Sequence, residues 1–387
     1  MLYSIKSLIP ALICCIAAGL YSAYLFDFLH LQTDTDSYLN AMNILLGEPA
    51  GQDKLHRLVK PLAIIFPVLL NKLLGLSTET GLYIQQWMAY LTASLLFYLI
   101  LERIFRNGRV ALMGLIMLLG CQPFAIYGLS LMTDGVAWAL QLAAIYYYLL
   151  IKSNENQNFI SKYLILGIIL GLGFFIKETI FLAGLFIFFD ILLGKSNLAS
   201  KVLNYIQIGL AFLLIVFSGS LLTQYLYNTS ILNWWQFAHS DSAVSAIDIK
   251  SYVQQVFRTL DLFWIAALGG IIISMGDLVQ VTIKKELLAL LLTGFIGLLI
   301  FPFLWDYRSD RILFMIALNL IPFAALFLSR LGLCGFIPAV AGAIMNLYMT
   351  YRIYRFEEPG WIVFMSICFI CLLFLTLAMN RFKFQAP

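Results

Sequence analysis

Residues 8–29 read LIPALICCIAAGLYSAYLFDFL, a run of mostly apolar side chains with a single acid near its end. About 20 apolar residues in an α-helix are enough to cross the hydrocarbon core of a bilayer. The run follows Lys6, as in a signal peptide, but no clear small-x-small cleavage site comes after it. We therefore interpret it as the retained first transmembrane helix of an α-helical membrane protein.

Composition extends this interpretation to the whole chain. Of the 387 residues, 62% are hydrophobic and 11% are charged, and the mean hydropathy is +0.92. Soluble domains typically carry about 25% charged residues. We expect an all-α, polytopic protein, a single integral membrane domain over residues 1–387 with about 12 transmembrane helices. The other apolar runs lie at about 82–101, 110–127, 134–151, 161–176, 178–194, 202–226, 261–276, 287–304, 312–329, 333–349 and 361–379.

The loops between these runs differ in charge. With the N-terminus in the cytoplasm, the short loops rich in Lys and Arg all face the cytoplasm, as the positive-inside rule requires. Most acids then lie outside, together with two long loops at about 30–81 and 227–260. In the first loop, residues 61–76 hold two prolines and Lys72, which predicts a helix along the membrane interface. In the second, Trp234-Trp235-Gln236-Phe237 is expected at headgroup level.

Several kinds of soluble chemistry are excluded by the sequence. The six cysteines lie in or beside apolar runs, so they form no extracytoplasmic disulfide framework. The three histidines lack metal-ligand spacing, and the chain has no Walker A sequence, no glycine-rich dinucleotide fingerprint and no GxSxG motif. The net charge of +4 suits basic cytoplasmic loops and indicates no nucleic-acid partner.

The stretch Thr33-Asp34-Thr35-Asp36-Ser37-Tyr38 opens the first long loop with two carboxylates. A helix beginning here would place Asp34 and Tyr38 on one face. An extended loop would instead bring Asp34 and Asp36 together on a divalent cation such as Mg²⁺ or Mn²⁺, the one cofactor that the sequence suggests. The alternative is that both acids only solvate the end of a span.

Further ionisable residues lie at predicted extracytoplasmic ends of spans. Each has an ordinary explanation alone: a helix N-cap for Asp134, an interfacial ion pair for Lys177-Glu178, and snorkelling anchors for Arg308 and Arg311. Their gathering on one side of the membrane is harder to explain in this way. Ionisable groups at membrane depth indicate a functional site.

This arrangement resembles the GT-C superfamily of membrane glycosyltransferases, such as protein mannosyltransferases and aminoarabinose transferases, which use polyprenyl- or dolichyl-phosphate sugars. The resemblance covers about residues 1–330 in order and spacing. The motifs that carry it are Asp34-x-x-x-Tyr38-x-x-Ala41 with Leu45-Leu46-Gly47, Arg57-x-x-Lys60-Pro61-Leu62 with Pro67, Met132-Thr133-Asp134, Gly171-x-Gly173 leading to Lys177, and Arg311 leading to Ile321-Pro322.

The resemblance implies a role for each matching residue. Asp34 takes the position of the first-loop acid held to be catalytic, assisted by Asp36 and Asp134. Asp36 departs from the family's commoner single acid or Asp-Glu pair, which leaves the identity of the base open. The residues implied to bind the donor phosphate are Arg57, Lys60, Lys177, Arg308 and Arg311, and those implied to line the substrate cavity are Tyr38, His56 and Glu178.

The implied chemistry agrees with the residue types. A carboxylate can take the proton of an acceptor hydroxyl, and arginine forks bind phosphate oxygens in pairs. We therefore expect an inverting glycosyltransferase, hexosyl or pentosyl, in the plasma (inner) membrane. It moves a sugar from a polyprenyl-phosphate donor to a glycan, lipid or protein acceptor on the extracytoplasmic face.

Two other functions stay open. An O-antigen polymerase or ligase would also act on lipid-linked glycans, but such enzymes rely on a large late loop, and the late loops here are short. A transporter or flippase of lipid-linked sugars should show inverted repeats and broken helices with ionisable groups near the middle of the membrane.

Overall fold

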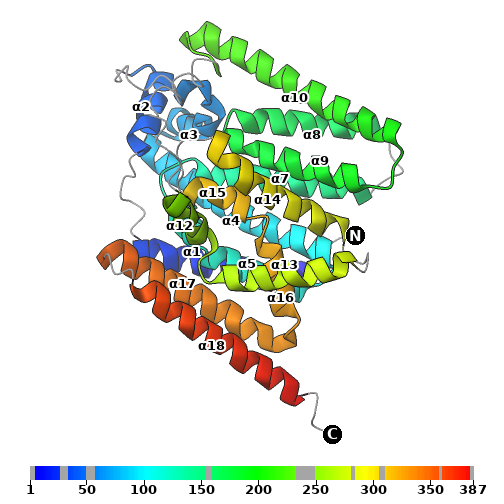
Figure 1. Cartoon of the computed structure of the whole chain (residues 1–387). Coiled ribbons are helices and arrows are strands. Elements are labelled where there is room, and N and C mark those ends of the chain that lie inside the picture. Colours follow the sequence, from blue (N-terminus) through cyan, green and yellow to red (C-terminus); the bar gives the residue numbers. More distant parts are fainter. Residues whose placement is uncertain are drawn as a thin grey trace.

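The computed structural model describes residues 5–26, 34–48, 57–153, 159–231, 249–279, 284–304, 310–356 and 360–383. These parts fold into α-helices joined by short turns and 3₁₀ segments, with no strand among them (Figure 1). The prediction of an all-α protein is confirmed. The predicted interfacial stretch Trp234-Trp235-Gln236-Phe237 lies outside the described residues.

The longest apolar helices are candidate membrane spans. Two further pairs reach the necessary length only together and are bent, α12 (Ile249–Leu260) with α13 (Phe263–Val279) by 87° and α15 (Asp310–Ala317) with α16 (Ile321–Ser329) by 51°. The described residues therefore contain six to eight candidate spans. The long helices are α1 (Ile5–Phe26), α4 (Thr78–Phe105), α7 (Asp134–Ser153), α10 (Leu198–Tyr227), α17 (Phe336–Phe356) and α18 (Gly360–Lys383).

The expectation of about 12 spans is not confirmed, although each of the predicted runs coincides with helix. The difference arises from length, because several runs form helices too short to cross a bilayer alone at 1.5 Å per residue. These shorter helices are α5 (Gly108–Gly120), α6 (Gln122–Tyr127), α8 (Phe159–Phe174) and α9 (Phe181–Leu193), and α14 (Lys285–Leu304) completes the bundle.

The first predicted loop is largely helical. It contains α2 (Thr35–Leu46), the 3₁₀ segment η2 (Pro61–Ala63) and α3 (Ile65–Leu74). Gly47 and Gly75 end α2 and α3 at φ of 82° and 67°, left-handed conformations that cost glycine little. The helix predicted within residues 61–76 is thus present as η2 and α3, and its position along the membrane interface stays a prediction. Both α2 and α3 lie at one end of the bundle (Figure 1).

The centre of the bundle is held by aromatic packing. Phe124 stacks between Tyr90 and Trp138, with ring centroids 4.8 Å and 5.4 Å away. Phe314 meets Trp138 edge to face at 5.1 Å. All four side chains are fully buried. Because the rings come from α4, α6, α7 and α15, this stack fixes the starts of α7 and α15 relative to α4.

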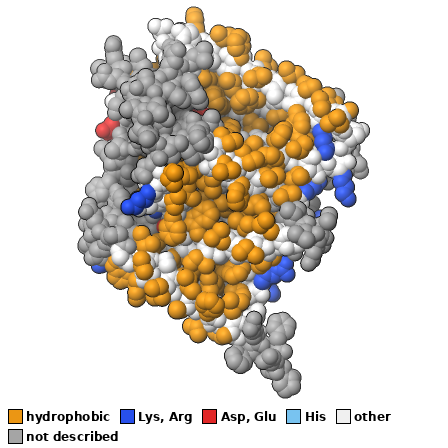
Figure 2. All heavy atoms as spheres, viewed as in Figure 1, with side chains coloured by type: hydrophobic (Ala, Val, Ile, Leu, Met, Phe, Trp, Pro, Cys, Tyr) orange, Lys and Arg blue, Asp and Glu red, His pale blue; other side chains and the backbone are white. Residues whose placement is uncertain are grey.

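The outer surface suits a lipid environment. Figure 2 shows a face dominated by hydrophobic side chains, with Lys and Arg mostly toward its edges. On α10, residues such as Leu213, Phe217 and Leu221 are more than half exposed. Gly167 and Gly171 let α8 approach α10 so closely that a Cβ at Gly167 would lie 2.4 Å from the Ile208 carbonyl oxygen. Close contacts of this kind at small residues are typical of membrane helices.

A second charged cluster lies at the other end of α7. Lys152, in the last turn of α7, pairs with Asp190 of α9 at 2.7 Å and with Glu286 of α14 at 2.6 Å. The Tyr148 hydroxyl donates to Asp190 at 2.6 Å. This cluster joins three helices near loops that the charge pattern assigns to the cytoplasm.

Candidate active site

Residues from five separate parts of the chain meet beside the start of α2. They come from α2 itself, the segment before η2, the start of α7, the turn between α8 and η3 (Glu178–Ile180), and the start of α15. The structure thereby brings together most of the residues that the sequence suggested. The residues are Asp34, Tyr38, Arg57, Lys60, Asp134, Lys177, Glu178 and Arg311.

Asp34 lies at the point where two guanidinium groups converge. It occupies the N-cap position of α2, yet its side chain makes no capping hydrogen bond. Instead, Asp34 Oδ1 lies 3.1 Å from Arg57 Nη2, and Oδ2 lies 3.0 Å from Arg311 Nη2. The Asp34 side chain is 31% exposed. It is therefore the carboxylate of this site that a substrate can reach.

Arg57 is held in place by α2. Its Nε donates to Ser37 Oγ at 3.0 Å and its Nη1 donates to Tyr38 Oη at 3.1 Å. The guanidinium carbon also lies 4.5 Å from the centre of the Tyr38 ring. With Asp34 on Nη2, each nitrogen of this guanidinium faces a partner at the start of one helix. Arg57 and Asp34 thus form one rigid unit.

Asp134 is the buried carboxylate of the site. It is the first residue of α7 and is 1% exposed. Its Oδ1 pairs with Lys177 Nζ, and its Oδ2 lies 3.8 Å from Arg311 Nη1 without a hydrogen-bond partner among the described residues. Arg311 therefore lies between the exposed carboxylate and the buried one, and it joins α2 to α7.

A third ion pair connects Lys60 to Glu178. Burial lowers the pKa of the Lys60 ammonium, and the neighbouring Glu178 carboxylate partly opposes that shift. Lys177 and Glu178 are adjacent in sequence but pair with different residues, one on α7 and one beside η2. The turn between α8 and η3 therefore clamps two separate parts of the site.

The described cluster carries more positive than negative charge. Four bases, Arg57, Lys60, Lys177 and Arg311, face three carboxylates, those of Asp34, Asp134 and Glu178. A surplus of guanidinium and ammonium donors favours binding of an anion such as a phosphate.

Three predicted residues are not part of this cluster as described. Asp36 is exposed on α2 and belongs to none of the ion pairs found among the described residues. His56 and Arg308 lie outside the described residues. Within the parts of the chain that the structure describes, no three His, Cys, Asp or Glu side chains gather in a way that could hold a metal ion. A divalent cation on Asp34 and Asp36 stays a prediction.

Sequence reasoning missed the residues that orient the charged groups. Thr133 Oγ1 donates to Tyr38 Oη at 2.9 Å, and Thr35 Oγ1 donates to the Leu131 carbonyl at 2.9 Å. Gln86 of α4 donates to the Met132 carbonyl. These bonds tie α2 and α4 to the segment that precedes α7. One signal was available, because adjacent amides at Gln85 and Gln86 are unusual inside an apolar helix.

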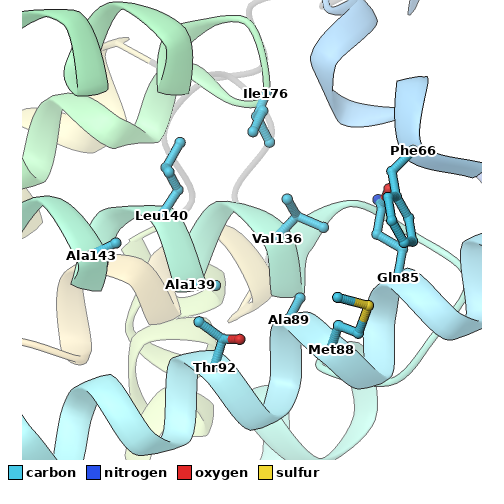
Figure 3. A pocket seen from close by; sticks show the side chains of 10 residues that line it. All are labelled: Phe66, Gln85, Met88, Ala89, Thr92, Val136, Ala139, Leu140, Ala143 and Ile176. Carbon is cyan, nitrogen blue, oxygen red and sulfur yellow. The ribbon is translucent and has the colours of Figure 1, made fainter.

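An apolar cavity of about 250 Å³ lies between α4 and α7 (Figure 3). Ile176 lines it beside Lys177, and Val136 lines it two residues after Asp134. Its other lining residues are Phe66, Gln85, Met88, Ala89, Thr92, Ala139, Leu140 and Ala143. The cavity is thus lined by two candidate membrane spans and by residues one and two positions away in sequence from the ion-paired Lys177 and Asp134.

Comparison with known families agrees with this geometry. Residues 60–222, less than half of the chain, match the profile of a family described as dolichyl-phosphate-mannose-protein mannosyltransferase. No curated protein sequence matches the chain significantly. The family match confirms the resemblance to GT-C membrane glycosyltransferases, and it supports a membrane glycosyltransferase that uses a lipid-linked sugar. Lys60, Asp134 and Lys177 lie inside the matched segment, whereas Asp34 and Arg311 lie outside it.

Proposed function

We propose that this protein is an inverting glycosyltransferase that moves a sugar from a polyprenyl-phosphate donor to an acceptor on the extracytoplasmic side of the plasma membrane. One observation carries the proposal. A partly exposed carboxylate, Asp34, lies between two guanidinium groups, in a protein that also has an apolar cavity between α4 and α7, lined by the sequence neighbour of Lys177. This juxtaposition supplies a base, a phosphate-binding group and a place for a lipid chain.

The cavity and the charged cluster suit the two parts of the donor. The apolar cavity takes the first isoprene units of the lipid chain, and the remainder of the chain stays in the bilayer because about 250 Å³ is too small for it. At the end of the cavity, Lys177 and Arg311 then face the phosphate. This arrangement sets the sugar carbon next to Asp34.

The reaction follows from these positions. Asp34 takes the proton of the acceptor hydroxyl while the acceptor oxygen forms a bond to C1 of the sugar. The bond between C1 and the phosphate oxygen breaks, and its electron pair leaves with the phosphate. Arg311 and Lys177 stabilise the charge that develops on that phosphate in a setting of low dielectric constant. Attack opposite the leaving group inverts the configuration at C1.

Asp134 serves in this proposal as a positioning residue. At 1% exposure it offers no access to an acceptor hydroxyl. Its carboxylate holds Lys177 and attracts Arg311, so that both cations point toward the phosphate. Lys60 adds a further cation, paired with Glu178 at the same end of the bundle.

The proposed sidedness rests on the loops at the other end of α7. Arg103 donates to the Leu149 carbonyl near the end of α7, and Lys284 donates to the Ile104 carbonyl in the last turn of α4. Basic groups at helix C-termini stabilise the helix dipole, and basic loops stay in the cytoplasm. The site at the start of α7 is then extracytoplasmic, and the N-terminus is cytoplasmic.

The test is sugar transfer in proteoliposomes. Purified protein receives a labelled polyprenyl-phosphate hexose or pentose and a mixture of lipid and glycan acceptors. We expect label to move to an acceptor, with the opposite anomeric configuration by NMR. Asp34→Asn should slow this transfer by at least about 10²-fold, and Glu48→Gln, which changes an exposed acid at the far end of α2, should not. Equal transfer by Asp34→Asn and wild-type protein would refute the assignment.

A transporter or flippase of lipid-linked sugars is the second candidate. It is favoured by the two bent helix pairs, one of which contains Arg311. Against it, the charged residues gather at helix ends and not near the middle of the bundle. The same proteoliposomes separate the two functions, because a flippase moves the labelled donor to the other leaflet without any acceptor being modified.

A further inference from the structure

Asp34 and a donor phosphate require the same hydrogen-bond donors. Arg57 and Arg311, which are 254 positions apart in sequence, approach the two oxygens of one carboxylate at 3.1 Å and 3.0 Å. A phosphate binds guanidinium groups through the same paired geometry as a carboxylate does. Both anions therefore compete for one position.

From this geometry, and on the basis of the proposed function, we propose that Asp34 is an internal competitor of the donor phosphate for Arg311, and that donor binding releases Asp34 to act as the base. Binding of the donor would thereby free the carboxylate that takes the proton of the acceptor hydroxyl. Arg311 is the switching group in this proposal, and Arg57 is a positioning residue.

The two arginines differ in how they are anchored. Arg57 is bound by Ser37 and Tyr38, which belong to the same helix as Asp34, so it keeps its position relative to that carboxylate. Arg311 belongs to α15, and its Nη1 approaches Met132 Sδ at 3.2 Å and Asp134 Oδ2 at 3.8 Å. These contacts hold Arg311 on the α7 side of the site. The contact between Arg311 and Asp34 is thus the one that can be exchanged without moving either anchor.

The exposure of the two carboxylates determines which of them the phosphate displaces from its cation. The ion pairs of Asp34 are partly exposed, and pairs of this kind contribute little free energy. The pair between Asp134 and Lys177 is buried, and separating it would leave an uncompensated charge. A phosphate that enters from the cavity therefore displaces Asp34 from Arg311 and leaves Asp134 in place.

The proposal predicts that removing one charged group of the site strengthens lipid binding. Undecaprenyl phosphate is titrated into protein in nanodiscs, and bound lipid is measured by native mass spectrometry. Asp34→Asn should bind this lipid about three- to tenfold more tightly than the wild type, because the competing charge is gone. Glu48→Gln removes an equal charge from the far end of α2 and should bind as the wild type does. Asp34→Ser provides a second variant in which the carboxylate is absent.

Two further results complete the test. In an Arg311→Gln background, Asp34→Asn should gain little affinity, since the competition is for Arg311. Equal or weaker lipid binding by both Asp34 variants would overturn the inference while leaving the proposed function intact. Absence of undecaprenyl phosphate binding to the wild type and every variant would overturn the proposed function and this inference together.

Discussion

The two ends of α7 carry two charged clusters of different design. Asp134 begins the helix in the candidate active site, and Lys152 lies in its last turn, about 27 Å away along the axis. The first cluster has four bases for three carboxylates. The second cluster has two carboxylates, Asp190 and Glu286, around Lys152.

The difference lies in what each cluster leaves accessible. In the second cluster, Asp190 is 1% exposed and receives bonds from both Lys152 and Tyr148, so its charge serves to join α7 to α9. In the first, the Asp34 side chain is 31% exposed, and the cations around it outnumber the carboxylates. Ion pairs at helix ends are therefore no evidence of a functional site by themselves. An accessible carboxylate among surplus cations is stronger evidence.

The largest expected effect is a loss of sugar-transfer activity when the accessible carboxylate of the first cluster is neutralised. Asp34→Asn should reduce the initial rate of sugar transfer about 10²- to 10⁴-fold, the usual contribution of a general base. Its thermal unfolding should change little, because the ion pairs of Asp34 are partly exposed. Transfer is measured with labelled donor, with Glu48→Gln as the control. A large loss of stability in Asp34→Asn would assign it a structural role instead.

The next prediction concerns the recovery of stability when a second mutation neutralises the acids left without their lysine. Lys177→Met removes the hydrogen-bonded partner of the buried Asp134 and leaves it only the more distant Arg311, so it should destabilise the protein by about 3–5 kcal/mol, as should Lys152→Met beside Asp190. Neutralising the remaining acids, with Asp134→Asn in one cluster or Asp190→Asn and Glu286→Gln in the other, should restore thermal stability.

Activity then distinguishes the rescued proteins. The protein neutralised at Lys152, Asp190 and Glu286 should transfer sugar at the wild-type rate. The Lys177→Met, Asp134→Asn protein should stay inactive, since it lacks a phosphate ligand. Recovery of transfer in both proteins would show that the two clusters are equally structural.

A smaller effect is expected from filling the apolar cavity. Ala143→Trp places an indole between α4 and α7 and should raise KM for the lipid donor about 10- to 100-fold, with kcat nearly unchanged. The matched control is Gly209→Trp on α10, where a new Cβ has nothing within 4 Å. Equal kinetics in the two variants would place the lipid chain elsewhere on the protein.

The smallest effect concerns pH. Because burial lowers the pKa of Lys60, this side chain loses its charge at a lower pH than an exposed lysine does, and transfer should decline accordingly on the alkaline side. Arginine stays protonated throughout this range. Lys60→Arg should therefore extend activity to higher pH. An alkaline limb that is identical in the two proteins would mean that the decline comes from another group.

The sequence predicted the helical class and the gathering of distant residues. The positive-inside rule sorted the loops by side, and this sorting placed Asp34, Asp134 and Arg311 at one end of the bundle before any contact was known. The individual pairings were not predictable. Lys177 pairs with Asp134 and not with its neighbour Glu178, because the turn after α8 directs the two side chains to different elements.

The predicted number of spans is not confirmed for a related reason. Hydropathy records how apolar a run is, but it does not detect the 87° bend between α12 and α13 or the early ends of α5 and α9. Likewise, the residue types in the Ser37 and Thr133 positions are common at helix starts, so only their contacts with Arg57 and Tyr38 reveal their part in the site.

The position of Arg311 shows that the site draws on helices beyond the segment that matches the known family. The segment that matches the known family ends at residue 222, well before α15. Without Arg311 the described cluster would hold three bases and three carboxylates and would be electrically neutral. The charge that attracts an anion is thus contributed by the later helices, at the start of a helix pair that is bent by 51°. Changes in the late helices can therefore alter anion affinity while the matched segment stays the same.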